Sequence, residues 1–166
     1  MISLPVHGST RVEDGVGVVT VTTECSTSLD DVWEAITTPE RLARWFGQIQ
    51  PRNLDAATFD ASLSTEWSGI IRVDSCEPPR VLRVTLVDEV EPPTAVSAVL
   101  EATESGTQLT IEERGLPTDD LAVYVAGWHA QVDQLLADLI NATPIEWRPR
   151  WEQLRAEYQN GPANGQ

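Results

Sequence analysis

Lysine is absent from this 166-residue chain, and all eleven basic residues are arginine, set against 26 acidic residues. The resulting net charge of −15 makes the surface strongly negative. Binding to phosphate backbones and to anionic lipid headgroups requires clustered positive charge, whereas these arginines are scattered along the chain. The composition therefore predicts that neither nucleic acid nor a membrane is a partner.

Cysteine and histidine are scarce, with only Cys25, Cys76, His7 and His129 in the chain. One pair of cysteines is not a disulfide framework, and in a reducing cytoplasm both are expected to be thiols. The two histidines lie far apart, so no zinc-ligand spacing exists. We therefore predict no metal site and no cofactor.

Long apolar runs are missing as well. None approaches the roughly 18–20 residues that a membrane-spanning helix needs. The first ten residues, MISLPVHGST, lack the basic start and the apolar stretch of a signal peptide, so a cytoplasmic location is expected. The chain length suits a single domain with a sizeable core, or with a core that encloses a cavity.

A hairpin and a long strand are predicted at the start of the chain. Asp14-Gly15 favours a two-residue turn between Ser9–Glu13 and Val16–Cys25. Apolar and polar residues then alternate through the second of these segments, as in a half-buried strand.

Two short helices are expected next. Ser28 followed by Asp31 is typical of a capped helix start, and apolar residues at helical spacing follow it. Thr38-Pro39 opens a second helix, because proline fits the first helical position, and Gly47 ends it.

Strand-like alternation with almost no helical period fills the middle of the chain. Turn signals at Pro78-Pro79, Pro92-Pro93 and Glu104–Gly106 separate the runs. Successive strands joined by short turns indicate an antiparallel meander with one covered face.

The chain ends in one long helix and one short one. Pro117–Asp120 favours a helix start, and Asn141–Pro144 ends that helix. Its apolar stripe is expected to be buried against the sheet and comprises Leu121, Tyr124, Val125, Trp128, Val132, Leu135, Leu136 and Leu139. A last short helix is predicted after Pro149, and residues 161–166 (GPANGQ) have the composition of a disordered tail.

These elements predict an α+β fold, in which a curved antiparallel sheet of about six strands wraps around a long C-terminal helix. The two short helices follow the first long strand. We expect residues 1–14 to form an N-terminal hairpin arm and residues 15–142 the main domain. Residues 143–166 would supply the short helix and the tail.

Four segments carry a resemblance to a known family, and they occur in the order VWEAITTPERLARWFG, SCEPPRVLRV, GTQLTIEERG and the helix start with Tyr124 and Gly127-Trp128. Together they resemble the START-like (SRPBCC) superfamily, in the branch named after the activator of the heat-shock-protein ATPase. The resemblance covers roughly residues 16–141 and implies the helix-grip fold. Its members include lipid carriers, polyketide cyclases, hormone sensors and co-chaperone domains, and the branch shares no catalytic motif.

A helix-grip fold places a cavity between its sheet and its long helix, which suggests a candidate site. Glu113 has the strand parity of Leu109 and would point inward, unless the strand end has already reached solvent. The same two alternatives apply to Asp88, which follows Leu86. Tyr124 would offer a phenol, and His129 either an imidazole or a surface pair with Asp133. The proposed ligand-binding set is Phe59, Trp67, Ile71, Val84, Leu86, Leu109, Glu113, Tyr124, Trp128 and His129.

Three functional hypotheses remain open. The first is a small domain that binds a small, largely apolar ligand between the sheet and the C-terminal helix. The second is a protein-interaction or co-chaperone-like regulatory module, with a homodimer or a protein partner bound through Trp147 and Trp151. The third is an enzyme of the cyclase or dehydratase type. No nucleophile is placed near His129, so no catalytic residue is assigned.

Overall fold

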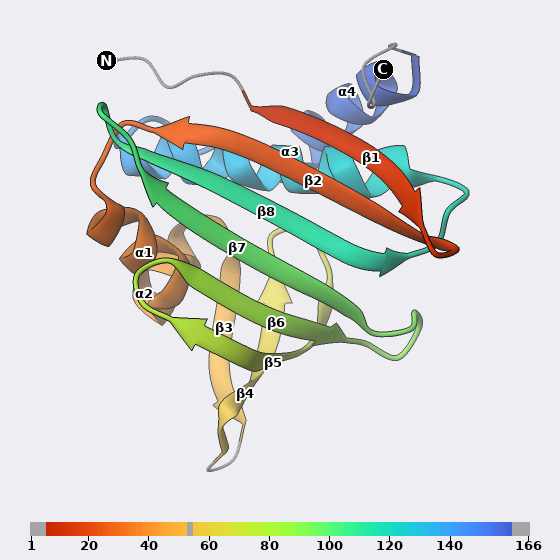
Figure 1. Cartoon of the computed structure of the whole chain (residues 1–166), viewed down its shortest axis with the longest axis horizontal. Coiled ribbons are helices and arrows are strands. Elements are labelled where there is room, and N and C mark those ends of the chain that lie inside the picture. The colour runs from red at the N-terminus through yellow and green to blue at the C-terminus, as the bar shows by residue number, and fades with distance from the viewer. Residues whose placement is uncertain (1–5, 53–54, 161–166) are drawn as a thin grey trace.

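The computed structural model describes residues 6–52 and 55–160. One eight-stranded antiparallel sheet forms a layer, and a long helix lies against one face of it (Figure 1). The spatial order is β1-β2-β8-β7-β6-β5-β4-β3, so the sheet is open, with β1 and β3 at its edges. The strands are β1 (His7–Glu13), β2 (Val16–Cys25), β3 (Gly47–Arg52), β4 (Asp55–Leu63), β5 (Ser68–Glu77), β6 (Val81–Val87), β7 (Thr94–Ala102) and β8 (Thr107–Leu116).

The expectation of about six strands is wrong, because the sheet also includes both edge strands. β1 pairs with β2 from His7 to Glu13, so the predicted arm continues the main sheet. β3 is mostly exposed and carries Pro51, which is tolerated at a sheet edge, where one row of backbone groups has no partner. An exposed edge strand has little hydrophobic alternation, and the sequence pattern therefore did not reveal it.

Helices α1 (Leu29–Thr37) and α2 (Pro39–Trp45) connect β2 to β3 and confirm the predicted helical corner. The Ser28 hydroxyl accepts a hydrogen bond from the Asp31 backbone N–H at 3.2 Å and caps α1. Trp45 is buried and donates its indole N–H to the Ala35 carbonyl at 3.0 Å. This bond fixes α2 against α1 at the end of the sheet.

The core lies between the central strands and the helices. Val21, Leu100 and Leu109 are each 1% exposed and point from the sheet toward α1 and α3 (Leu121–Leu139). Burial of each such side chain contributes about 1.5–3 kcal/mol. On α3, Val125, Val132 and Leu135 are fully buried, and Leu121, Trp128 and Leu139 are partly buried and pack against the core. All six therefore belong to the face of α3 that packs on the core, as expected.

Helix α4 (Trp147–Asn160) packs against α3 on the side away from the central strands (Figure 1). It begins before Pro149, not after it, because proline fits the first helical turn, where its missing N–H has no partner to lose. Leu154 and Tyr158 are its buried residues, at 2% and 8% exposure. Residues 161–166, expected to be a tail, lie outside the described residues.

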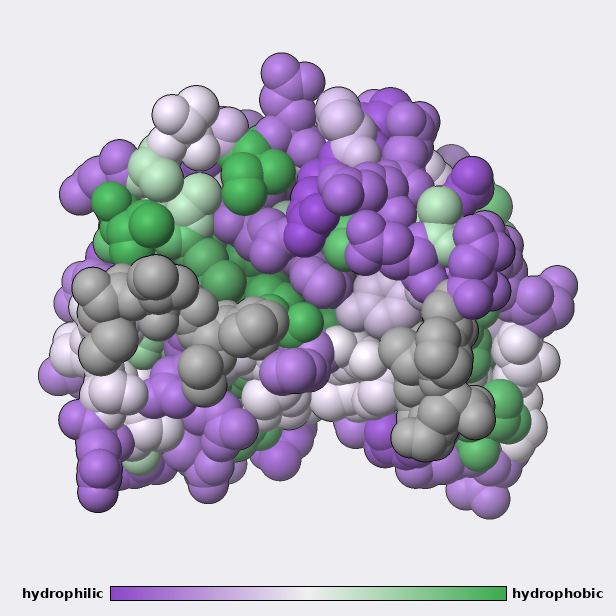
Figure 2. Space-filling view, turned by 90° about the horizontal axis from the view of Figure 1, so that it is seen from above, coloured by the Kyte–Doolittle hydropathy of each residue, from purple (hydrophilic) through white to green (hydrophobic). Residues whose placement is uncertain are grey.

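Seen from above, the surface is largely hydrophilic, with one larger group of hydrophobic residues at the left of the view and smaller separate ones elsewhere (Figure 2). None of the described helices combines the length and the apolar character that crossing a bilayer requires.

Candidate ligand-binding site

A cavity of about 500 Å³ opens where α3 meets the ends of several strands and the first turns of α4. Segments far apart in the sequence form its walls. The residues that line the cavity are Leu63, Thr65, Trp67, Leu86, Asp88, Glu91, Pro92, Thr94, Glu113, Gly115, Leu116, Pro117, Val123, Tyr124, Gly127, Trp128, Gln131, Trp147 and Trp151. Most of this lining is apolar or aromatic, as is usual for a small-molecule pocket.

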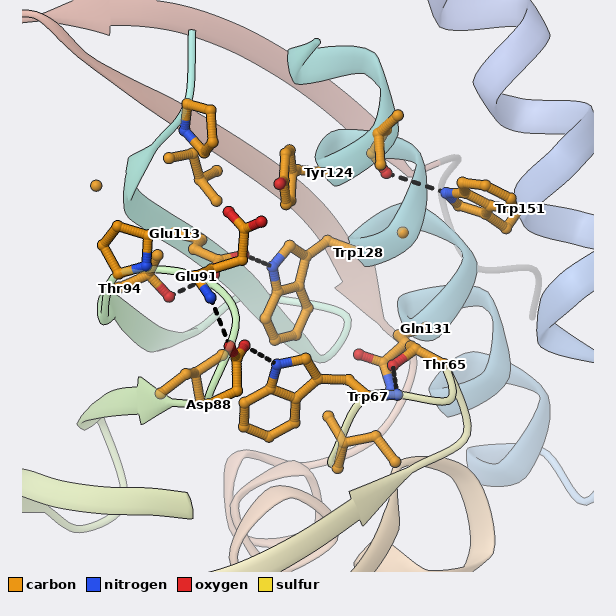
Figure 3. Close-up of a pocket in the computed structure, with 18 of the residues that line it drawn as sticks. Thr65, Trp67, Asp88, Glu91, Thr94, Glu113, Tyr124, Trp128, Gln131 and Trp151 are labelled. Carbon is orange, nitrogen blue, oxygen red and sulfur yellow. Dashed lines mark hydrogen bonds between the residues drawn. The ribbon is translucent and has the colours of Figure 1, made fainter. Parts of the chain in front are cut away.

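Two indoles, those of Trp67 and Trp128, point toward the same space from different parts of the fold (Figure 3). Trp67 stands in the turn between β4 and β5, and Trp128 in the middle of α3. A side chain at Gly69 would put its Cβ 2.7 Å from the Trp67 ring, so a glycine there lets the indole lie close to β5. These two rings give the cavity flat apolar surfaces.

Glu113 of β8 is the buried carboxylate of this cavity, at 8% exposure. Its two oxygens accept hydrogen bonds from the Trp128 indole N–H at 2.8 Å and from the Thr94 hydroxyl at 2.6 Å. Burial raises the pKa of Glu113, whereas these two hydrogen bonds act in the opposite direction. The side chain therefore points inward and has not reached solvent at the strand end.

Asp88, just beyond β6, lines another wall of the cavity and connects two of its segments by hydrogen bonds. It accepts the Trp67 indole N–H at 2.7 Å and the backbone N–H groups of Val90 and Glu91, each at 2.7 Å. The bond from the Glu91 backbone is the main cause that lowers the pKa of Asp88. The loop between β6 and β7 is thereby joined to the turn that carries Trp67.

Tyr124 and Glu91 lie next to each other at the cavity, from α3 and from the β6–β7 loop (Figure 3). Burial raises the pKa of the Tyr124 phenol, and the negative charges of Glu91 and Glu113 raise it further. Tyr124 is therefore neutral at physiological pH, with its hydroxyl in a negative environment.

Helix α4 closes another side through two stacked tryptophans, Trp147 and Trp151, whose rings lie 5.2 Å apart. The Trp147 indole N–H donates to the Gly127 carbonyl at 3.1 Å, and that of Trp151 to the Val123 carbonyl at 3.0 Å. Both rings therefore pack on the first half of α3 and complete the cavity wall.

Five residues of the sequence-based set line the cavity, namely Trp67, Leu86, Glu113, Tyr124 and Trp128. The other five do not line it. Leu109 and Ile71 are buried, at 1% and 8% exposure, and Val84 packs against the core. Phe59 lies on β4 opposite Ile71, far along the strand from the turn that carries Trp67.

His129 faces α4 rather than the cavity. Its Nδ1 lies 2.8 Å from the Tyr158 hydroxyl, and its Nε2 lies 3.8 Å from Asp133. Burial lowers the pKa of His129, and Asp133 opposes that shift. Since Asp133 also receives Arg150 at 2.7 Å, the histidine belongs to the contact between the two C-terminal helices.

Sequence reasoning did not place several lining residues, among them Thr65, Glu91, Thr94 and Gln131. Gln131 is 3% exposed on α3, one turn after Trp128, and a polar residue in an apolar helical stripe was a signal available in the sequence. Thr94 and Glu91 had no such signal, because the pairing of β7 with β8 brings Thr94 to Glu113, and the β6–β7 loop brings Glu91 to the cavity. Among the described residues, no cluster of His, Cys, Asp or Glu could hold a metal ion.

An open antiparallel sheet that grips a long helix over a cavity defines a helix-grip protein of the START-like kind. The sequence profile of the family described as "Activator of Hsp90 ATPase homolog 1-like protein" matches residues 26–139, and the chain belongs to this family. The resemblance read from the sequence is therefore confirmed. No curated protein matched the chain.

Solved structures support the same fold. CalU16 from Micromonospora echinospora is 24% identical with a TM-score of 0.71, over 92% of this chain and 93% of CalU16. A protein from Bordetella parapertussis is 20% identical with a TM-score of 0.71, over 90% of this chain and 87% of that protein. DynU16, described as a protein in the dynemicin biosynthetic locus, is 24% identical with a TM-score of 0.55, over 91% of this chain and 49% of DynU16.

Proposed function

We propose that this protein is a cytoplasmic binding domain for a small, largely apolar molecule held between the sheet and α3. The observation that carries the proposal is the cavity itself, whose volume of about 500 Å³ suits a small-molecule pocket. Trp67, Trp128 and Leu86 would contact the apolar body of the ligand, and Glu113 and Tyr124 would orient it. The DynU16 relative lies in a biosynthetic locus, which agrees with a natural-product ligand.

Occupancy of the cavity is testable with a neutral environment-sensitive dye such as Nile red. We expect saturable binding with a rise in dye emission and quenching of tryptophan fluorescence, because four tryptophans line the cavity. Leu86→Trp would fill part of the space and should weaken binding about tenfold or more. Val90→Trp is the matched control, since Val90 is 86% exposed and does not line the cavity. Equal binding by both folded variants would contradict the proposal.

A second candidate function is proton-transfer catalysis on the bound molecule. The observation that favours it is the carboxyl of Glu113, buried with a raised pKa in the cavity that also holds the Tyr124 phenol. Native mass spectrometry of gently purified protein would recover a ligand for the test. If Glu113 is catalytic, the wild type should convert this molecule, and Glu113→Gln should bind it without converting it. If the protein is only a binding domain, both wild type and Glu113→Gln should release the molecule unchanged.

The interaction hypothesis has less support from the contacts. Trp147 and Trp151, through which a partner would bind under that hypothesis, already donate their indole N–H groups to α3. Arg155 and Arg148 lie over the Trp151 ring at 4.9 and 5.7 Å. These contacts favour packing onto the domain over docking to another protein.

A further inference from the structure

The hydrogen-bonding groups of the cavity are unevenly divided between donors and acceptors. All four indole N–H groups that line it donate within the protein: Trp67 to Asp88, Trp128 to Glu113, and the two of α4 to carbonyls of α3. The Thr94 hydroxyl donates to Glu113. Among the described lining side chains, the Tyr124 and Thr65 hydroxyls donate no hydrogen bond within the protein, so a ligand finds few donors for its own acceptors.

Acceptors remain available in the same space. Each carboxylate oxygen has two lone-pair directions, and each oxygen of Glu113 accepts one hydrogen bond from the described residues. Gln131 is 3% exposed, and the one side-chain hydrogen bond that it makes to a described residue runs from Nε2 to the Ser64 hydroxyl at 3.5 Å. Its amide oxygen has no partner among the described residues and lines the cavity, where it would accept from a bound molecule.

The charge of the lining has one sign. Asp88, Glu91 and Glu113 are acidic, and none of the described lining residues is Arg, Lys or His. Arg148 and Arg155 of α4 lie over the Trp151 ring but do not line the cavity, and Arg148 pairs with Glu66 at 2.7 Å. An anionic ligand would be repelled here, whereas a cation would gain from the carboxylates and from the faces of Trp67 and Trp128.

We infer that this cavity selects ligands that carry a protonated amine on an apolar body. The inference rests on the proposed small-molecule function and names the chemical class of its ligand. The ammonium would donate to Glu113 and to the Gln131 amide oxygen, and the apolar body would lie against the two indoles.

Three probes with the same aromatic body test this selection: naphthylethylammonium, naphthylethanol and naphthylacetate, titrated by calorimetry. We expect the ammonium to bind about tenfold tighter than the isosteric alcohol, and the acetate to bind most weakly. Equal binding of ammonium and alcohol, or tighter binding of the acetate, would overturn the inference and leave the proposed function standing. Binding of none of the probes would contradict both.

Variants separate the cavity from the general negative charge of the protein. Glu113→Gln should weaken ammonium binding about tenfold and leave the alcohol unchanged. This variant should fold, because the glutamine oxygen can still accept from Trp128, and its amide N–H can donate to the oxygen of the Thr94 hydroxyl, which in the wild type is the donor. Glu91→Gln, at an exposed lining position, should weaken ammonium binding about threefold.

Glu104→Gln removes the same charge from an exposed turn outside the cavity and is the matched control. We expect it to leave ammonium affinity within about twofold of wild type. If Glu104→Gln weakened binding as much as Glu113→Gln, the preference would come from the whole surface and not from the cavity, and the inference would fail.

Discussion

Trp128 of α3 donates its indole N–H to the carboxylate of Glu113 on β8 over 2.8 Å. This bond joins the long helix to the sheet at the wall of the cavity. Glu113 is the one carboxylate among the buried residues of the described chain, and burial of a carboxylate costs free energy unless it is hydrogen-bonded. Trp128 therefore has two roles, as an apolar wall and as a partner of this charge.

Replacement of the indole by a ring without the N–H separates these two roles. We expect Trp128→Phe to lower the free energy of unfolding by about 1–3 kcal/mol, because Glu113 loses one of its two donors. Trp128→Ala should cost about 3–5 kcal/mol, since packing is lost as well. The free energy of unfolding of each variant is to be measured by urea titration at neutral pH.

The control for that measurement is Trp151→Phe, which removes a bond to the neutral carbonyl of Val123. It should cost only about 0.5–1.5 kcal/mol. If Trp128→Phe proved no more costly than this control, Glu113 would not depend on the indole.

The pH dependence of stability should report the buried carboxyl. Burial raises the pKa of Glu113 above its unfolded value of 4.5, so the folded protein binds this proton more tightly than the unfolded chain does. The corresponding stabilisation is fully present below pH 4.5 and is lost as pH rises through the folded pKa. Glu113→Gln has no such loss, so its stability relative to that of the wild type should increase as the pH rises above 4.5.

An exposed carboxylate supplies a control of opposite sign. Hydrogen bonds from Arg114 and Arg11 lower the pKa of Glu13 from 4.5 to about 2. Its stabilising effect is present above pH 4.5 and is lost as pH falls toward about 2, so Glu13→Gln should approach wild-type stability in acid. Parallel pH curves for wild type and Glu113→Gln would contradict the expectation for Glu113.

The two cysteines should differ in reactivity. Cys76 is exposed, whereas Cys25 is buried in β2, and burial raises the pKa of its thiol to about 12. A thiol reagent should therefore label one site per chain rapidly in the native protein and a second one only after unfolding, without prior reduction. Rapid labelling of two sites in the native protein would contradict the burial of Cys25. No labelling after unfolding would contradict the expectation that both cysteines are free thiols.

The attachment of α4 can be measured at Leu154, which is 2% exposed between the two C-terminal helices. Leu154→Ala should cost about 2–5 kcal/mol and should also weaken dye binding, because Trp147 and Trp151 of the same helix line the cavity. Glu152→Ala, at an exposed position of α4, should change neither quantity. Full stability of Leu154→Ala would mean that α4 is not part of the folded unit.

The local elements of this protein follow from signals between neighbouring residues. Ser28 with Asp31 marked the start of α1, Pro39 that of α2, and the alternation in Val16–Cys25 predicted β2. The order of such segments was sufficient to recognise the family, because each depends on residues only a few positions apart. Elements without such a signal were missed, and β3 is the clear case.

The cavity depends instead on contacts over long sequence separations. Parity showed that Glu113 shares a face with Leu109, but it could not tell a buried carboxylate from one that had reached solvent. That was decided by Thr94, 19 positions earlier, and Trp128, 15 positions later, which meet it only in the folded chain. His129 likewise faces α4, because it packs beside Tyr158, which lies 29 positions later in the sequence. The sequence by itself therefore determined the helices, most of the strands and the family, whereas the tertiary structure decided which side chains enclose the cavity, because helix packing and sheet curvature bring the strand ends together.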